Sequence, residues 1–370
     1  MKRIIGLRKA ARPVALATAA VALLTSCSMI HEDLPECATR PETRASVNFI
    51  YDYNTQEQDL FAQHVGSVTL YVFDKDGRFL QQSEHTAAEI RTGNLQVPLS
   101  LPYGEYRLYA SARASEEGYE ASLLTPGAKF RKSALAIGDA DNAGFLTLDN
   151  TNGLVDHQSL PLEDQWISRQ MTPLIITEAP MPAEGAPQPP TVVVEATVPM
   201  QRITNTLHLT ITRGNAADAN LPALSASDYE VSVQTRTGRH ELDLLGRPTA
   251  AATPLTYTPW AYTTTRAAAP SLQADIAMSR LMLEEDAAQH TRLVIRSRLS
   301  GEVFEYDLPT LLATSREAYP GKEWTAQEYL DREYDYNLAV EFTETDDGWR
   351  YIQVSIPILN WSKRIQNVEL

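Results

Sequence analysis

The sequence predicts an all-β protein with two tandem β-sandwich domains behind a lipidated N-terminal tether. Three observations lead to this prediction. Apolar and polar residues alternate with a period of two along most of the chain, which is typical of strands. Convincing helical periodicity is rare, and Gly, Pro, Asn and Asp interrupt the alternating runs. A cysteine also follows a short apolar segment near the N-terminus, as in a targeting signal.

The N-terminal residues have the pattern of a bacterial lipoprotein signal. Basic residues precede the apolar run Val14 to Leu24, which is shorter than the roughly 20 residues that span a bilayer. The small residues Thr25 and Ser26 then lead to Cys27. We expect residues 1–26 to be cleaved off between Ser26 and Cys27, and the Cys27 thiol to carry the lipid. Several acyl chains at one residue anchor a protein stably in a membrane, whereas a single acyl chain binds the membrane only marginally. An ordinary secretory signal with a chance cysteine is the alternative.

The residues behind the predicted anchor indicate which membrane holds it. Residues 27–44 have no strand alternation and are expected to form a flexible tether. Ser28 replaces the aspartate that retains lipoproteins in the inner membrane, so we expect the cell outer membrane. Glu32 and Asp33 resemble the export tag of surface-exposed lipoproteins in the Bacteroides group, although they could equally be solvated charges in a tether.

Charge and cysteine content exclude several classes of protein. The formal net charge of the chain is −15, and cleavage of the signal removes five basic residues, which leaves −20. No basic cluster remains, so we expect no nucleic-acid partner. Cys27 and Cys37 are the two cysteines, which leaves no room for a disulfide framework or a cysteine metal site. Cys37 is either a spare thiol or an intermolecular link.

The first sandwich is predicted over residues 45–199. The turn Asp74-Lys75-Asp76-Gly77 predicts a hairpin. The expected strands, each with one face in a core and one in water, include Val47–Tyr53, Val68–Val72, Arg78–Leu80, Leu95–Leu101, Tyr106–Arg113 and Thr191–Val198. The proline-rich stretch from Glu178 to Pro190 can be neither a central strand nor a helix. We place the domain boundary near Met200.

The second sandwich is predicted over residues 200–370. Its expected strands include Leu207–Thr212, Tyr229–Val233, Leu338–Phe342 and Ile352–Ile358. The best helix candidates are Ser279–Glu285 and Thr325–Asp331, and both are short.

The sequence offers little support for catalysis. The seven histidines form no HExxH motif, and no G-x-S-x-G, P-loop or G-x-G-x-x-G pattern is present. We therefore expect no enzyme activity, no metal site and no cofactor. Asp139-Ala-Asp141-Asn142-Ala-Gly144 has some features of a calcium loop, but Ala143 occupies a ligand position and Asn150 replaces the bidentate glutamate. A solvated turn is the simpler interpretation of this loop.

Tyrosines offer a second kind of candidate site. They could form a platform on which glycans stack, but large aromatic residues on strands usually pack in a core, which we favour. The six tyrosines in question are Tyr51, Tyr53, Tyr71, Tyr103, Tyr106 and Tyr109.

Several segments together resemble the fimbrial anchor lipoproteins of the Bacteroidales, the base subunits of type V pili. The segments are the stretch from Cys27 to Cys37, Val47 to Tyr53, Asp59 to Val65, Val68 to Asp74, Leu330 to Tyr336 and Ile358 to Ser362. The resemblance implies two transthyretin-like β-sandwiches, a position at the outer membrane, and a role in anchoring fimbriae and limiting their length. It implies fimbrial shaft subunits (fimbrillins) as partners. A surface glycan-binding lipoprotein is the alternative, and a lipid-anchored hydrolase is a weaker third.

The resemblance also implies that shaft subunits join by inserting a strand of one subunit into a groove of the next. A base subunit fixed by its N-terminus should keep its own first strand, Val47 to Tyr53, in that groove. The C-terminal segment Trp361 to Leu370 is then a candidate to reach the adjacent pilin by strand addition. The same segment could equally be the last strand of the second sandwich.

Overall fold

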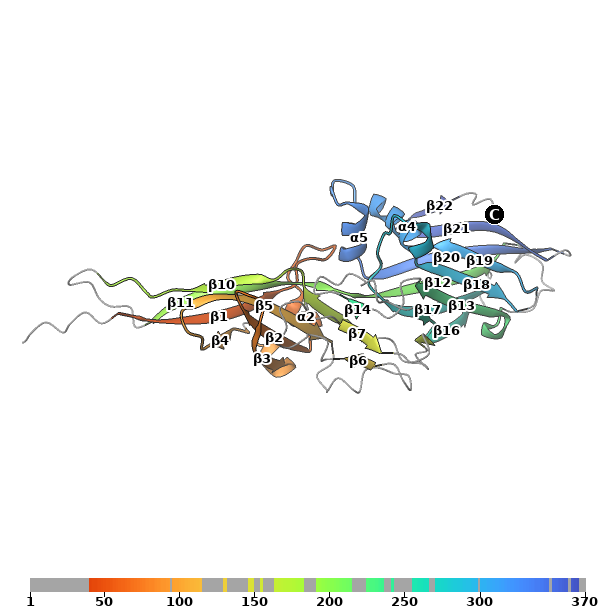
Figure 1. The fold of residues 1–370 in the computed structure, drawn as a ribbon. Helices are drawn as coiled ribbons and strands as arrows, with labels where there is room; N and C mark the ends of the chain where they lie inside the picture. Colours follow the sequence, from red (N-terminus) through yellow and green to blue (C-terminus); the bar gives the residue numbers. More distant parts are fainter. Residues whose placement is uncertain are drawn as a thin grey trace, which may run out of the picture. The chain divides into compact units, whose positions relative to one another are not determined.

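The structure of the protein is a computed structural model, which describes residues 40–93, 95–114, 129–131, 146–149, 154–155, 163–182, 191–214, 224–235, 241–242, 255–265, 270–298, 300–345, 348–358 and 361–365. Strands predominate, in agreement with the predicted all-β class (Figure 1). Arg44–Thr177 and Val193–Leu370 form one compact unit, which includes most of each predicted sandwich. Residues up to Arg202, where β11 ends, are hereafter the N-terminal half, and the residues after it are the C-terminal half.

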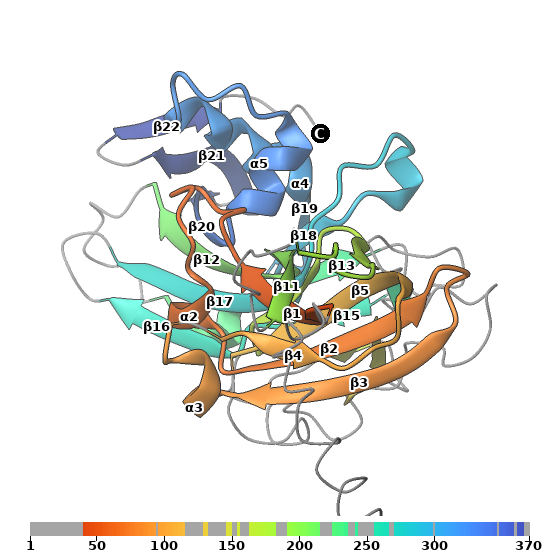
Figure 2. The ribbon, with the colours of Figure 1, turned by 90° about the vertical axis from the view of Figure 1, so that its left-hand side faces the viewer.

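An eight-stranded sheet dominates the N-terminal half. Its order is β3-β2-β5-β9-β11-β1-β4, with β10 also paired to β5. Figure 2 shows β3 at the outer edge, next to β2. The strands are β1 (Glu42–Ile50), β2 (Ser67–Asp74), β3 (Phe79–Thr86), β4 (Val97–Leu99), β5 (Gly104–Arg113), β9 (Gln165–Ser168), β10 (Thr172–Ile176) and β11 (Thr191–Arg202), and the helices are α2 (Phe61–His64) and α3 (Ala87–Ile90).

The predicted hairpin is present between β2 and β3. The Asp74 carboxylate accepts hydrogen bonds from the backbone N–H groups of Asp76 (2.9 Å) and Arg78 (2.8 Å), which closes the turn. Gly77 has φ +84°, a conformation that glycine adopts without steric cost. Val68 is therefore paired with His85 and Leu70 with Ser83 across the hairpin.

The sheet formed by β2, β5 and β9, hereafter the shared sheet, has a hydrophobic core on each face. Val68, Leu70 and Leu108 belong to the core of the N-terminal half. The neighbouring residues on the same strands point to the opposite face of the sheet. Of these, Tyr71 and Tyr109 belong to the core of the C-terminal half. The expectation of one solvated face is therefore wrong for β2 and β5, because the C-terminal half covers the second face.

Two sheets enclose the core of the C-terminal half. The six-stranded sheet has the order β16-β17-β12-β20-β21-β22, and the five-stranded sheet β19-β18-β13-β15-β8. The strands of the first are β12 (Thr204–Arg213), β16 (Ala261–Thr265), β17 (Ser271–Ser279), β20 (Asp335–Thr345), β21 (Gly348–Ile358) and β22 (Trp361–Ile365). Those of the second are β8 (Leu154–Val155), β13 (Tyr229–Thr235), β15 (Leu255–Tyr257), β18 (Arg292–Ser297) and β19 (Val303–Asp307).

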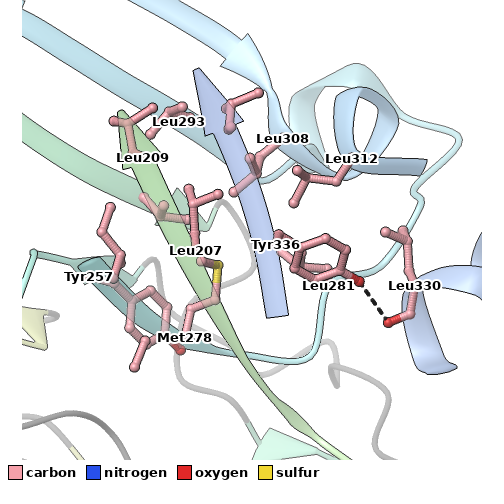
Figure 3. Close-up of a cluster of buried hydrophobic side chains, with 14 of the residues drawn as sticks. Leu207, Leu209, Tyr257, Met278, Leu281, Leu293, Leu308, Leu312, Leu330 and Tyr336 are labelled. Atoms are coloured by element: carbon pink, nitrogen blue, oxygen red, sulfur yellow. Dashed lines mark hydrogen bonds between the residues drawn. The ribbon is translucent and has the colours of Figure 1, made fainter. Parts of the chain in front are cut away.

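Side chains from both sheets and from helices fill this core (Figure 3). Leu207 on β12, Met278 on β17 and Tyr257 on β15 point toward one another, and all three are almost fully buried. The Tyr336 hydroxyl donates to the carbonyl oxygen of Leu330 at 3.1 Å. The helical segments of this half are η2 (Ala226–Asp228), η3 (Ala287–Gln289), α4 (Leu308–Ala313), η4 (Thr314–Ala318) and α5 (Ala326–Arg332).

One of the two predicted helices forms. The helix expected at Thr325–Asp331 is α5, and the Thr325 hydroxyl caps it by accepting from the Glu328 N–H at 3.1 Å. The helix expected at Ser279–Glu285 is wrong, because β17 continues through Ser279. The Gln327 side chain then binds the backbone of the next residues, accepting from Leu283 N at 2.8 Å and donating to Leu281 O at 3.0 Å. Contacts with α5 thus replace helical hydrogen bonds.

Short strands cross the predicted domain boundary in both directions. β8, from the first predicted domain, pairs in parallel with β15 of the C-terminal half. β14 (Glu241–Leu242), from the second, joins β6 (Lys129–Arg131) and β7 (Leu146–Asp149) in a three-stranded sheet. The strand expected to end at Val198 is β11, which continues through Met200 to Arg202 before β12 begins at Thr204.

The C-terminal segment forms an edge strand of its own half. β22 pairs antiparallel with β21, from Ile358 opposite Trp361 to Val354 opposite Ile365. Of the two interpretations of this segment, the structure thus favours a strand of the protein's own sheet for residues 361–365. Residues 366–370 lie outside the described residues.

Candidate functional site

The residues of the predicted anchor lie outside the described residues. Ser26, Cys27 and Cys37 all precede Arg40, where the described chain begins. Lipidation of Cys27 and cleavage after Ser26 therefore stay predictions. The calcium-like loop Asp139 to Gly144 is outside the described residues as well. Among the residues that the structure does describe, no three His, Cys, Asp or Glu side chains are grouped so that they could hold a metal ion.

Histidine 208 lies between two carboxylates on the six-stranded sheet. Its Nδ1 is 2.6 Å from Asp275 Oδ1 on β17, and its Nε2 is 3.0 Å from Asp335 Oδ1 on β20. The order of the strands places these residues together: β12 lies between β17 and β20, and His208 is opposite Asp275. The hydrogen bond to Asp335 is the main cause that raises the pKa of His208 to about 9, and Asp275 adds to it. His208 is thus an ion-paired cation at neutral pH.

The tyrosines proposed for a glycan platform are mostly core residues, in agreement with the favoured interpretation. Five of the six are buried, and only Tyr103 is exposed, at 52%. Tyr51 packs edge-on against Trp166, with ring centroids 5.8 Å apart, and burial raises its pKa. Tyr71 and Tyr109 lie on the face of the shared sheet that the C-terminal half covers. These rings therefore offer no stacking surface for a sugar.

Arg202 is the centre of a cluster where β11 ends, hereafter the Arg202 cluster. Its guanidinium is 4.2 Å from the ring centroid of Tyr334 and 5.7 Å from that of Trp166, and it forms a salt bridge with Asp164. His64 lies beside the Tyr334 ring at 6.2 Å, and burial together with Arg202 lowers its pKa. Because Tyr334 precedes β20, this cluster ties the N-terminal half to the C-terminal half.

A polar cavity of about 330 Å³ lies near this cluster and is hereafter the Tyr53 pocket. Residues from distant parts of the chain form it. The ring of Tyr53 carries the guanidinium groups of Arg169, at 3.6 Å, and Arg332, at 4.3 Å. Arg280 donates to both carboxylate oxygens of Asp331, and both residues line the cavity. The lining residues are Tyr53, Arg169, Gln170, Pro199, Gln201, Arg280 and Asp331.

Sequence reasoning missed the Arg202 cluster and the Tyr53 pocket. Both depend on the arrangement of the two halves, which no local pattern reveals. The available signals were three segments that the resemblance singled out: Val47 to Tyr53, Asp59 to Val65 and Leu330 to Tyr336. They supply Tyr53, His64, Asp331 and Tyr334.

Several sheet edges lack a paired neighbour among the described residues. β3 and β4 end the eight-stranded sheet, β16 and β22 end the six-stranded sheet, and β10 pairs only with β5. Along β3, Leu80, Gln81 and Gln82 are exposed, and on β10 Ile175 is 57% exposed. Edges of this kind can accept a strand from another chain.

The molecule defined by these features is a two-core β-sandwich protein with open sheet edges. No helix among the described residues is both long and apolar enough to cross a membrane. Solved structures share the fold, and their sequence identities are all low. A candidate polysaccharide-binding protein from Bacteroides thetaiotaomicron has 23% identity and a TM-score of 0.65, covering 88% of this chain and 99% of its own. A candidate adhesin from Bacteroides ovatus has 21% identity and a TM-score of 0.66, covering 92% and 98%.

A third solved structure is the fimbrial anchor protein Mfa2 from Porphyromonas gingivalis. It has 14% identity and a TM-score of 0.57, and covers 88% of this chain and 99% of its own. Among curated protein sequences, none matches. The model of the fimbrillin-A associated anchor proteins Mfa1 and Mfa2 matches residues 34–367. The chain therefore belongs to this family, in agreement with the resemblance found in the sequence.

Proposed function

We propose that this chain is an outer-membrane lipoprotein that anchors or assembles fimbriae at the cell surface, by binding and without catalysis. The match of residues 34–367 to the fimbrial anchor family carries this proposal. That match begins at residue 34, seven residues after Cys27, which is the predicted lipid attachment site. An anchor needs a fixed end and a binding surface, and the acylated Cys27 would supply the first.

The tether separates these two functions. Residues 27–44, of which Glu42 to Arg44 already belong to β1, would carry the two sandwiches, residues 45–199 and 200–370, away from the membrane surface. The net charge of −20 expected for the mature chain disfavours direct docking on anionic lipid. The binding surface would therefore face outward, toward fimbrial shaft subunits.

Open sheet edges are the best candidates for the contact with a shaft subunit. β1 lies between β11 and β4 in its sheet, which supports the expectation that the first strand stays in place. A partner strand would then have to add at an edge such as β10 or β3, with backbone hydrogen bonds for affinity and side-chain pockets for specificity. The glycan-binding alternative has less support, because the tyrosines that would form its platform are buried.

A Cys27→Ala variant tests the anchor, and Cys37→Ala is the matched control. Both substitutions remove one thiol from the same N-terminal region. We expect Cys27→Ala to leave the outer-membrane fraction and Cys37→Ala to stay in it. If Cys27→Ala still sediments with membranes after a salt wash, the lipid anchor is wrong.

Capture of the intact surface complex tests the partner. After mild crosslinking of whole cells, we expect a fimbrial shaft subunit to be recovered with the wild-type protein. Retention of the purified protein on neutral polysaccharide, with no fimbrial subunit in the complex, would favour the glycan-binding alternative instead.

A further inference from the structure

We propose that the Tyr53 pocket binds a small polar ligand that carries one carboxylate and has the size of a single sugar acid. This inference is independent of fimbrial anchoring. It depends on the charge, the hydrogen-bond donors and the volume of the pocket.

The charge balance of the pocket favours an anion. Arg280 is neutralised by Asp331, with two hydrogen bonds of 2.7 Å. Arg332 is neutralised by Glu328: Nε and Nη2 of Arg332 donate to Oε1 of Glu328 at 3.0 and 2.9 Å. Arg169 has no carboxylate partner among the described residues, and its side chain is exposed at the pocket. One positive charge therefore remains uncompensated in a protein that is strongly acidic overall.

The fold holds Arg169 and Gln170 in place rather than leaving them on a loose loop. They lie in the break between β9 and β10, both of which pair with β5. The buried Ser168 bridges that break, because its hydroxyl accepts the Ala110 N–H at 2.7 Å. The Arg169 N–H donates to Pro199 O at 2.8 Å. A fixed backbone on both sides orients the two side chains toward one ligand position.

Tyr53, whose ring lies against the Arg169 guanidinium, lies in a loop that side-chain hydrogen bonds hold in place. The buried Asn54 donates its side-chain amide to Tyr51 O at 3.0 Å and to Gln58 O at 2.8 Å. The ring of Tyr53 already carries two guanidinium groups, so it cannot stack on a sugar. Recognition would therefore use hydrogen bonds, with the planar fork of Arg169 on the carboxylate and the Gln170 amide on a hydroxyl.

The size and polarity of the pocket limit the ligand further. A cavity of about 330 Å³ is at the lower end for small-molecule sites. It exceeds what acetate or phosphate would fill, and its arginine and glutamine lining disfavours an apolar ligand. A six-carbon sugar acid meets both conditions.

Calorimetric titration of the purified full chain at fixed ionic strength tests this proposal. The probes are glucuronate, its neutral counterpart methyl glucoside, acetate and inorganic phosphate. We expect saturable binding of glucuronate only, below about 10 mM. No saturation by glucuronate in this range, or equal binding of methyl glucoside, would overturn the proposal. Binding of acetate or phosphate as tight as that of glucuronate would also overturn it, by showing a simple anion site.

Variants assign the binding to this pocket. We expect Arg169→Gln to weaken glucuronate binding about tenfold or more, because a charge-assisted fork is lost. Arg107→Gln is the matched control: it removes the same charge from an exposed residue of β5 outside the pocket and should leave the affinity unchanged. Gln170→Glu places a negative charge at the pocket, and should weaken binding as well. Unchanged affinity in both pocket variants would refute the site.

Discussion

Arg280 and Asp331 form a buried two-pronged ion pair that joins the end of β17 to α5. Nε and Nη2 of the arginine each lie 2.7 Å from a different carboxylate oxygen, and the side chains are only 9% and 7% exposed. Gln327 donates to the same carboxylate at 3.0 Å. The pair therefore fixes the course of the chain directly after β17.

Asp331→Asn should destabilise the fold strongly. It leaves the Arg280 charge buried without its partner, which costs about 3 kcal/mol in unfolding free energy. Glu305→Gln is the matched control, because it changes the same kind of group in the more exposed pair with Arg292 and should cost less than about 1 kcal/mol. Urea unfolding of both variants provides the measurement. Equal losses would show that the buried pair has no special role.

His208 should make the stability fall as the pH rises. Its folded-state pKa is raised to about 9, above the ordinary value of about 6.5. The stabilisation is therefore complete below about pH 6.5 and disappears as the pH passes 9. Allowing for the partial exposure of the ring, we expect a loss of about 1–2 kcal/mol in this window.

Comparison of the wild type with His208→Gln isolates this effect. The unfolding free energies should differ most at pH 6 and converge by pH 10. Asp335→Asn should shift the NMR titration of the His208 ring to lower pH, because Asp335 is the main cause of the raised pKa. A ring that titrates near pH 6.5 in the wild type would contradict the ion-paired geometry.

Tyr336→Phe should cost about 1 kcal/mol. The hydroxyl of this buried residue lies 3.1 Å from the carbonyl oxygens of both Leu330 and Glu333, and the phenylalanine removes that donor without changing the packing of the ring. Tyr103→Phe, at a ring that is 52% exposed, should leave the melting temperature unchanged. A neutral result at Tyr336 would mean that water replaces the lost donor.

Two C-terminal deletions separate the roles proposed for that segment. Removal of residues 361–370 deletes β22 and exposes the edge of β21, so the melting temperature should fall. Removal of residues 366–370 alone leaves β22 in place and should have little effect on stability. If the longer deletion keeps the melting temperature but abolishes fimbrial attachment, the segment serves a partner rather than its own sheet.

The sequence predicts those parts of the fold that depend on neighbouring residues. Asp74 and Gly77 determine their hairpin locally, and Thr325 caps α5 three residues before Glu328. The error at Ser279–Glu285 has a long-range cause, since Gln327 takes the hydrogen bonds that a helix would need. The burial of Tyr109 agrees with the interpretation of it as a core residue, but only the tertiary structure shows that the C-terminal half covers this face of β5.

The candidate sites divide in the same way. Cys27 is recognisable because its signal is contiguous in sequence. The Tyr53 pocket cannot be recognised from the sequence, because Tyr53, Arg169 and Arg280 are each more than a hundred residues apart along the chain. Neither residue type nor spacing indicates that Arg169 lacks a carboxylate partner. The missing carboxylate partner becomes visible only in the tertiary structure, which shows the residues around Arg169.

The shared sheet has a consequence for cooperativity. Tyr71, Phe73, Tyr109 and Ile167 belong to strands of the N-terminal half, yet their side chains complete the core of the C-terminal half. A fragment that ends at Arg202 would present these four apolar side chains to water, and the complementary fragment would lack them. We therefore expect neither fragment to fold on its own, and calorimetry of the intact chain should show a single melting transition.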